Sequence, residues 1–195
     1  NVAQMIDSTG IVLASQTKQK LVPFGEYLPG EESFPFLRDW LPNARRYLPG
    51  DELNLFPEVD GSSILTAICY DIGFEPILKK ALESGVRVVW NPVNDGWFPS
   101  SMAAWHKALA QFRSAEMGLP LIRVSNSGYS VIADDRGVVL QTGEWNQSVA
   151  KTVTIPIPEH AGPWLHIAEI FRLALLGWVL LDVGLGLLLR RSQED

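Results

Sequence analysis

The sequence predicts a layered α/β domain, and two observations lead to this prediction. Short apolar or β-branched runs that suit strands alternate with helical stretches in the middle of the chain, and further short strands divided by turns follow them. The composition agrees, because 47% of the 195 residues are hydrophobic, which supplies a core and argues against general disorder. A chain of this length fills one domain of ordinary size.

The first predicted elements form a hairpin, in which the runs VAQMID and IVLASQTK flank a turn at Gly10. The stretch 21–57 follows and holds six of the thirteen prolines, so regular structure cannot continue through it. A loop this long in a compact domain is usually functional or disordered, and its aromatic residues argue against disorder. We therefore predict a lid-like loop at 21–57, whose aromatic and arginine residues either contact lipid or anchor the loop to its own domain.

The middle of the chain alternates strands and helices, which are predicted at 63–69 (strand), 75–82 (helix), 86–91 (strand) and 100–117 (helix). Ser100 or Ser101 can cap the second helix, and Gly118 with Pro120 can stop it. Three short strands divided by the turns NSG and DDRG follow. The run KTVTIPIP predicts a last strand, whose prolines mark a sheet edge or an end.

The C-terminus predicts a membrane helix. The 23 residues at 167–189 are mostly apolar, and about 20 are needed to cross a bilayer. Three charged residues interrupt the run, but 173–189 is apolar on every side, which favours a membrane span over a surface helix. We predict a transmembrane helix at 167–189 and, from the arginine pair that follows it, a cytoplasmic tail at 190–195. A buried amphipathic helix is the alternative.

Charge and residue usage exclude several functions. The net charge is −6 and no Lys/Arg-rich run exists, which argues against a nucleic-acid surface. The three histidines are scattered and there is one cysteine, so neither a metal site nor an internal disulfide is expected. No phosphate loop or dinucleotide fingerprint is present, so no cofactor is expected. The chain begins at Asn1 without a signal peptide, which indicates a piece of a longer protein.

Cys69, the single cysteine, ends a predicted strand and is followed by Tyr70 and Asp71. A free cysteine is usually inert packing, but the carboxyl end of a strand in an open α/β sheet is where such folds place ligands. Tyr70 and Asp71 suit the rim of a site better than a core. A nucleophilic thiol also needs a neighbouring base or cation to form the thiolate. The residues alone leave both interpretations open.

Lys18 and Glu26 are candidate neighbours of the thiol. A lysine could donate hydrogen bonds to an oxyanion, and a carboxylate could take a proton or hold the lysine. No spacing rule links either residue to Cys69, so solvated surface charges are the alternative. The run NPVNDGWF at 91–98 is either a site wall or an ordinary tight loop. His106 is a conceivable partner of the thiol, although packing or exposure to water suits it better.

Four motifs resemble those of the carbon–nitrogen hydrolase (nitrilase) superfamily and occur in the same order: TKQKLVPFGEYLPG, ILTAICYDIGFEP, NPVNDGWF and RSAEMGLPLIRVSNSGYSVIADDRGVV. The first motif, with Lys20 in place of a histidine, is similar to that of the apolipoprotein N-acyltransferase family, the membrane enzymes that add the third acyl chain to bacterial lipoproteins. The resemblance covers nearly the whole chain. It implies the second half of a nitrilase-like α-β-β-α sandwich at 1–160, followed by one transmembrane helix.

The resemblance also implies roles for individual residues. Cys69 is the implied nucleophile, Lys18 steadies the oxyanion, and Glu26 is a supporting acid. Tyr70 follows the nucleophile, and Asp71 stands in a supporting position where the family usually has glutamate. The general-base glutamate of the Glu-Lys-Cys triad is expected upstream of this chain, so the isolated chain is expected to be inactive.

The implied reaction is acyl transfer through a thioester. A fatty acyl chain moves from a phospholipid donor to the N-terminal amine of a diacylglyceryl-cysteine apolipoprotein, with Cys69 as its carrier. The implied location is the bacterial inner membrane, with the catalytic domain on the periplasmic side. Two alternatives stay open: a nitrilase-type amidase that acts on a small soluble amide, and an inactive truncated module anchored to the membrane.

Overall fold

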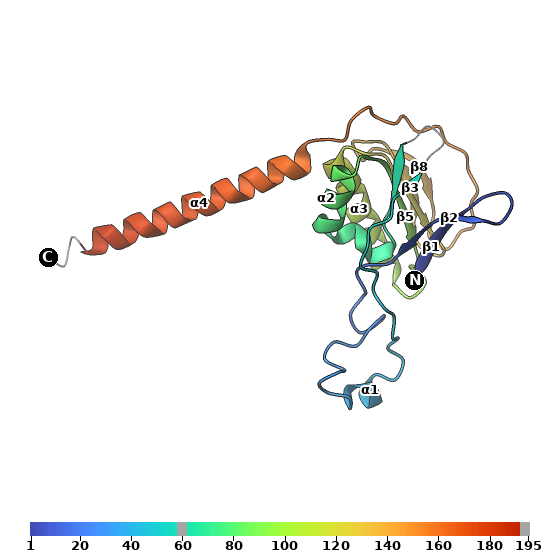
Figure 1. Ribbon diagram of the computed structural model, residues 1–195, viewed down its shortest axis with the longest axis horizontal. Coiled ribbons are helices and arrows are strands. Elements are labelled where there is room, and N and C mark those ends of the chain that lie inside the picture. The colour runs from blue at the N-terminus through green and yellow to red at the C-terminus, as the bar shows by residue number, and fades with distance from the viewer. Residues whose placement is uncertain (58–61, 192–195) are drawn as a thin grey trace. The chain divides into compact units, whose positions relative to one another are not determined.

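The computed structural model describes residues 1–57 and 62–191, and the chain divides into two units, Asn1–Gly162 and Pro163–Asp195. The first unit is built on a six-stranded sheet with the strand order β3-β4-β5-β6-β7-β8 (Figure 1). β4, β5 and β6 are parallel, and the outer pairs are antiparallel. The strands are β3 (Phe56–Pro57), β4 (Ser63–Thr66), β5 (Val86–Val93), β6 (Leu121–Ser125), β7 (Ser130–Ala133) and β8 (Val139–Gly143).

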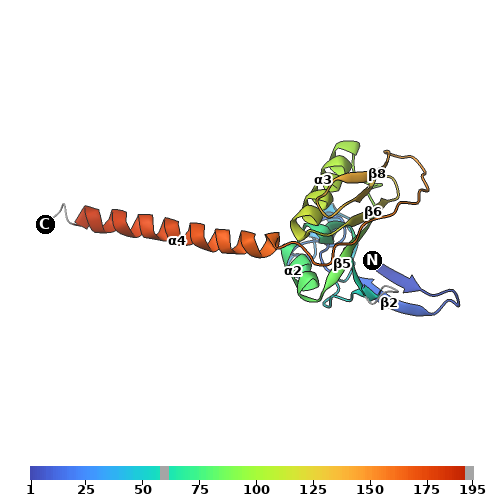
Figure 2. The same ribbon diagram turned by 90° about the horizontal axis from the view of Figure 1, so that it is seen from above.

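Two helices, α2 (Glu75–Glu83) and α3 (Ser100–Met117), connect the parallel strands. α2 links β4 to β5 and α3 links β5 to β6, so right-handed crossovers place both helices on the same face of the sheet. α2 packs on β5, and α3 packs on β6 and β7 (Figure 2). The predicted α/β class is confirmed. Both layers contribute fully buried apolar side chains to the core, among them Leu65, Leu78, Val89, Ala110 and Leu121.

The N-terminal hairpin forms as predicted, from β1 (Val2–Ile6) and β2 (Val12–Thr17). The two strands are antiparallel and make a separate sheet. Gly10 has φ 90°, a backbone conformation that favours glycine and closes the turn. The end of β2 delivers Lys18, whose backbone N–H donates to the carbonyl of Asn1 at 2.9 Å. The hairpin therefore fixes the backbone position of Lys18.

Three details differ from the sequence predictions. The strand predicted at 63–69 ends at Thr66, and a 3-10 turn, Cys69–Gly73, follows it. The strand predicted at 151–158 is wrong, because this run has no regular structure and its two prolines lack the N–H groups that a ladder needs. The serine cap of α3 is also wrong, since Pro99 occupies the N-cap position and no side chain caps the helix.

The stretch 21–57, called the long loop below, contains one short helix, α1 (Leu37–Trp40). Figure 1 shows the long loop extending away from the sheet, with α1 near its far end. Phe34, Phe36 and Trp40 are each more than half exposed, and Phe36 packs edge to face on the other two rings at centroid distances of 6.0 and 5.6 Å. These aromatic residues contact one another and do not anchor the long loop to the sheet.

The second unit contains one long helix, α4 (Trp164–Arg191). Within the described residues, no helix combines the length and the apolarity that a bilayer crossing requires. The structure therefore does not bear out the transmembrane helix predicted at 167–189, although a helix does form there. Arg172 and Asp182 both fall within the stretch and lower its apolarity. Residues 192–195 of the predicted tail lie outside the described residues.

Candidate active site

Cys69 lies just after β4, where the chain enters the 3-10 turn. Its φ is 51°, in the left-handed region, which costs a residue with a Cβ atom about 1–2 kcal/mol. Strain of this kind persists only where the surroundings enforce it, and it is concentrated at functional sites. The residue is 7% exposed and forms a buried apolar cluster with Ile68 and Val93. It is thus both buried and placed beyond the carboxyl end of a strand.

A cavity of about 620 Å³ opens at Cys69. Its walls come from the beginning of the chain, from the long loop and from the segment after β5, and include Ala3, Glu26, Arg45 and Trp97. The run NPVNDGWF therefore forms part of the wall of this cavity. This agrees with the first of the two interpretations that the sequence left open, a site wall or an ordinary tight loop. Glu26 is the carboxylate that lines the cavity among the described residues. The thiol consequently has space for a substrate in front of it.

Lys18 and Glu26 form a buried ion pair, with 1% and 4% of each residue exposed. The Nζ of Lys18 lies 2.6 Å from Oε2 of Glu26. The Glu26 carboxylate also accepts hydrogen bonds from Nδ2 of Asn1 at 2.7 Å and from the backbone N–H of Val22 at 2.8 Å. Neither residue is a solvated surface charge. The carboxylate thus has three donors around it, one of which is the ammonium group of Lys18.

Asp71 is buried and braces the turn that begins with the thiol. Its carboxylate accepts hydrogen bonds from the backbone N–H groups of Lys20 at 2.7 Å and Gln19 at 3.3 Å, the two residues that follow the lysine of the ion pair. Burial raises the pKa of Asp71 above its ordinary value, and these backbone hydrogen bonds oppose the increase. Tyr70 instead packs edge to face on Phe74 and is not part of the cavity lining.

The electrostatics of the site disfavour a resting thiolate. Burial raises the pKa of the Cys69 thiol above its ordinary value. The charge of Lys18 lowers that pKa by a smaller amount, whereas the carboxylates of Asp95 and Glu26 add to the increase. The thiol is therefore mainly protonated at neutral pH, and a base would have to take its proton before it could act as a nucleophile.

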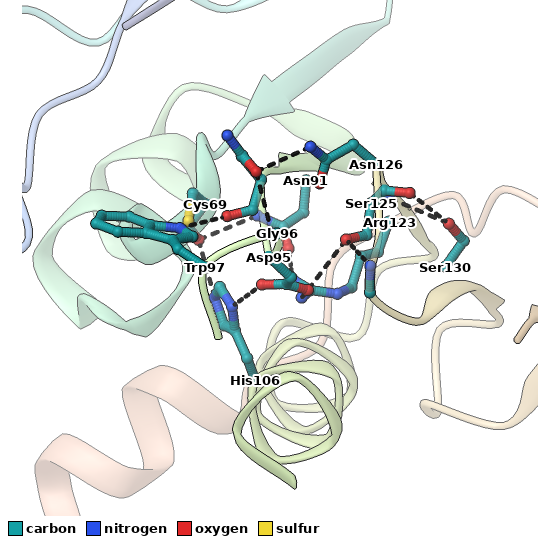
Figure 3. A network of polar contacts seen from close by, with 12 residues as sticks. Cys69, Asn91, Asp95, Gly96, Trp97, His106, Arg123, Ser125, Asn126 and Ser130 are labelled. Atoms are coloured by element: carbon teal, nitrogen blue, oxygen red, sulfur yellow. Dashed lines mark hydrogen bonds and ion pairs between the residues drawn. The ribbon is translucent and has the colours of Figure 1, made fainter. Parts of the chain in front are cut away.

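A buried polar network lies behind the thiol (Figure 3). Asp95 accepts hydrogen bonds from Nδ1 of His106 at 3.1 Å, from Arg123 at 2.8 Å and from Oγ of Ser125 at 3.1 Å. Arg123 also donates to Oδ1 of Asn91 at 2.6 Å. Burial opposes the ionisation of Asp95, but the hydrogen bond from His106 and the charge of Arg123 outweigh it and hold the pKa of this carboxyl below its ordinary value. Asp95 is therefore ionised.

The sequence did not single out Asn91, Asp95 or Arg123 as site residues. Arg123 offered a signal, because it interrupts the apolar strand LIRVS, and an arginine in a buried strand requires a charged partner. His106 was considered as a partner of the thiol, and it contacts the carbonyl oxygen of Cys69. In the described part of the chain, no group of three or more His, Cys, Asp or Glu residues could hold a metal ion.

Comparison with protein families gives a match between the carbon–nitrogen hydrolase family and residues 1–160. An apolipoprotein N-acyltransferase of Allorhizobium ampelinum is 32% identical over 160 residues, which are 80% of this chain and 30% of the relative. One from Pasteurella multocida is 32% identical over 180 residues, 90% of this chain and 34% of the relative. The chain thus spans about a third of the length of these curated relatives.

Two solved structures have a similar fold. A mutant amidase from Nesterenkonia sp. AN1, with the acetamide moiety of fluoroacetamide added at its active-site cysteine, gives a TM-score of 0.54 at 22% identity, over 74% of this chain and 51% of that one. Nit3 of Saccharomyces cerevisiae, a member of branch 10 of the nitrilase superfamily, gives a TM-score of 0.57 at 15% identity, over 76% and 50%. At these identities the likeness shows the nitrilase-like fold alone.

The buried ion pair provides a test of the charges around the thiol. Lys18→Gln removes a cation that favours the thiolate, so the pKa of Cys69 should rise and its alkylation by iodoacetamide should require a higher pH. Glu26→Gln removes a carboxylate that disfavours the thiolate, so the same pKa should fall. Peptide mass spectrometry of the full-length gene product, alkylated over a pH series, measures both shifts. Shifts in the same direction would contradict this electrostatic account.

Proposed function

Because the chain belongs to the carbon–nitrogen hydrolase family, we propose that it carries the nucleophile of an acyltransferase, which moves a fatty acyl chain from a phospholipid to the N-terminal amine of a lipoprotein. The observation that carries this proposal is the position of Cys69, which is buried, has a strained backbone conformation and borders a cavity of about 620 Å³. The relatives named apolipoprotein N-acyltransferase support the choice of the two substrates.

In the first step, the Cys69 sulfur attacks the carbonyl carbon of the phospholipid ester after a base has taken the thiol proton. The new C–S bond creates an oxyanion, to which we assign Lys18 as the hydrogen-bond donor. When the oxyanion collapses, the ester C–O bond breaks, and the base returns the proton to the oxygen of the departing lysophospholipid. Cys69 then holds the acyl chain as a thioester.

In the second step, the amine of the lipoprotein attacks the thioester. A C–N bond forms, the C–S bond breaks, and the base transfers the proton of the amine to the sulfur, which restores the thiol. We assign Glu26 to holding Lys18, because its buried carboxylate lies 2.6 Å from the lysine Nζ and the backbone N–H of Val22 and Nδ2 of Asn1 fix it there. The base is assigned to a glutamate upstream of Asn1, as the resemblance to the family implies, and Asp71 to bracing the turn of the nucleophile.

A second cavity, of about 390 Å³, offers a route for the acyl chain. It shares Arg45 and Trp97 with the cavity at the thiol, and its walls include Trp40 and Leu41 of the long loop. We propose that the acyl chain passes through it and that the exposed aromatic residues of the long loop contact the lipid surface. Arg45 lines both cavities and is placed to meet the headgroup phosphate.

The two proposed substrates are lipid-bearing molecules of a bilayer, so the reaction takes place at a membrane surface. We propose the bacterial inner membrane, with the catalytic unit on the periplasmic side. The long loop supports a reaction at a lipid surface, because it extends from the sheet with Phe34, Phe36 and Trp40 exposed (Figure 1). Its other two arginines, Arg38 and Arg46, both pair with Glu31.

The thioester provides the direct test of the proposed function. The full-length gene product, incubated with phospholipid, should gain the mass of one acyl chain on Cys69, and hydroxylamine should remove it because it cleaves thioesters. Cys69→Ala is the matched control and should gain no such mass. An adduct that persists in Cys69→Ala contradicts the thiol mechanism. Hydrolysis of a small amide that depends on Cys69, without a phospholipid adduct, would favour the amidase instead.

The long loop provides a second test. Phe36→Ser together with Trp40→Ser should raise KM for phospholipid in vesicles roughly a hundredfold or more, since each of the two lost aromatic contacts with lipid is worth about 1.5–3 kcal/mol and about 1.4 kcal/mol is tenfold. Stability should change little, because both side chains are more than half exposed. Leu48→Ser is a control for surface polarity, as Leu48 is 84% exposed and lines neither cavity. An unchanged KM in the double variant would show that these two side chains do not contact lipid during the reaction.

A further inference from the structure

The two peptide groups on either side of the Cys69 α-carbon are both held by hydrogen bonds. The preceding one is fixed because the carbonyl of Ile68 accepts the backbone N–H of Asp71 at 3.1 Å. The following one is fixed because the carbonyl oxygen of Cys69 faces Nδ2 of Asn91 at 3.2 Å and Nε2 of His106 at 3.3 Å (Figure 3). Both torsion angles of the nucleophile are thus set, and two side chains from other elements contribute.

The orientation of these two donors follows from the network behind them. Arginine has only donors, so the contact of Arg123 with Oδ1 of Asn91 turns Nδ2 of the amide toward the carbonyl of Cys69. An ionised carboxylate and a carbonyl have only acceptors, and the two ring nitrogens of His106 each face one of them, Nδ1 toward Asp95 and Nε2 toward the carbonyl of Cys69.

The charged groups near the thiol come from several elements. Asp95 follows β5, Arg123 lies in β6 and His106 in α3, whereas Lys18 and Glu26 come from the hairpin and the long loop. His106 is 4% exposed. Both ring nitrogens thus face protein groups, and the contact of His106 with the nucleophile is with the backbone.

We propose that His106 is a positioning residue for the nucleophile. Its Nε2–H, oriented by Asp95, holds the carbonyl of Cys69 and keeps this residue in the left-handed conformation in which it borders the cavity. Asn91 is the second donor to the same carbonyl, and Arg123 orients it. The inference rests on the proposed function, because it takes Cys69 as the nucleophile.

Three variants separate positioning from a structural role. In His106→Gln the amide nitrogen can occupy the place of Nε2 and donate to the carbonyl of Cys69. In His106→Asn the shorter amide can reach Asp95 but not Cys69, and His106→Leu removes both contacts. The full-length gene product is assayed for kcat and KM of phospholipid transfer, for the rate of Cys69 alkylation by iodoacetamide, and for its thermal unfolding.

The Asn and Leu variants should lower kcat roughly 10- to 100-fold with little change in KM, because the reacting atom is displaced while the cavity is intact. The Gln variant should recover most of kcat, and alkylation should follow the same ranking. Equal losses in all three variants that parallel their thermal unfolding would overturn the proposal, as would unchanged kcat in all three. If the wild type transfers no acyl chain, the proposed function fails, and the alkylation ranking of Gln against Asn still decides this inference.

Discussion

The left-handed backbone of Cys69 is the constraint on which the site depends. A residue with a Cβ atom takes this conformation at a cost of about 1–2 kcal/mol, so the surrounding structure has to enforce it. Here β4 ends at Thr66 and the chain turns at once into a 3-10 helix. The sheet, α3 and the loop after β5 all contribute groups that hold this turn. As a result, the thiol borders a cavity and is not sealed within the core.

Buried charge is concentrated around this one turn. The Lys18–Glu26 pair comes from one part of the chain, and Asp95 with Arg123 comes from the sheet. Burial of ion pairs is costly, and well-packed apolar residues often serve stability as well or better. Each pair acts on Cys69 in both directions, because Lys18 and Arg123 lower the pKa of the thiol whereas Glu26 and Asp95 raise it. The hydrogen bonds that Asp71 accepts link the two residues after Lys18 to the turn that begins at Cys69.

The alternation of strands and helices could be predicted because each element carries its own local signals. Pro76 lies in the first turn of α2, and Gly118 ends α3 in a left-handed conformation. The end of β4 could not be predicted from its apolar run, because contacts from Asn91 and His106 hold the turn that follows it. The same holds for the pairing of Lys18 with Glu26, which the residue types made conceivable but which no local spacing rule predicts.

The network of Asp95 and Arg123 shows why the rest of the site escaped prediction. Its members are separated by 28 residues in the chain and meet only through the parallel pairing of β5 and β6. At 167–189, hydropathy correctly indicated a helix, but the apolarity of the described residues does not reach that of a membrane span. Local patterns thus identified the elements, whereas the site arises from contacts between them.

The backbone strain at Cys69 can be measured by comparing Cys69→Gly with Cys69→Ala in the full-length gene product. Both variants remove the thiol, but glycine adopts a φ of 51° without a Cβ penalty, whereas alanine retains that penalty. If the surrounding contacts impose a strained turn, denaturant unfolding should show the glycine variant to be about 1 kcal/mol more stable than the alanine variant. An alanine variant that is equally stable or more stable would contradict a strained backbone at Cys69.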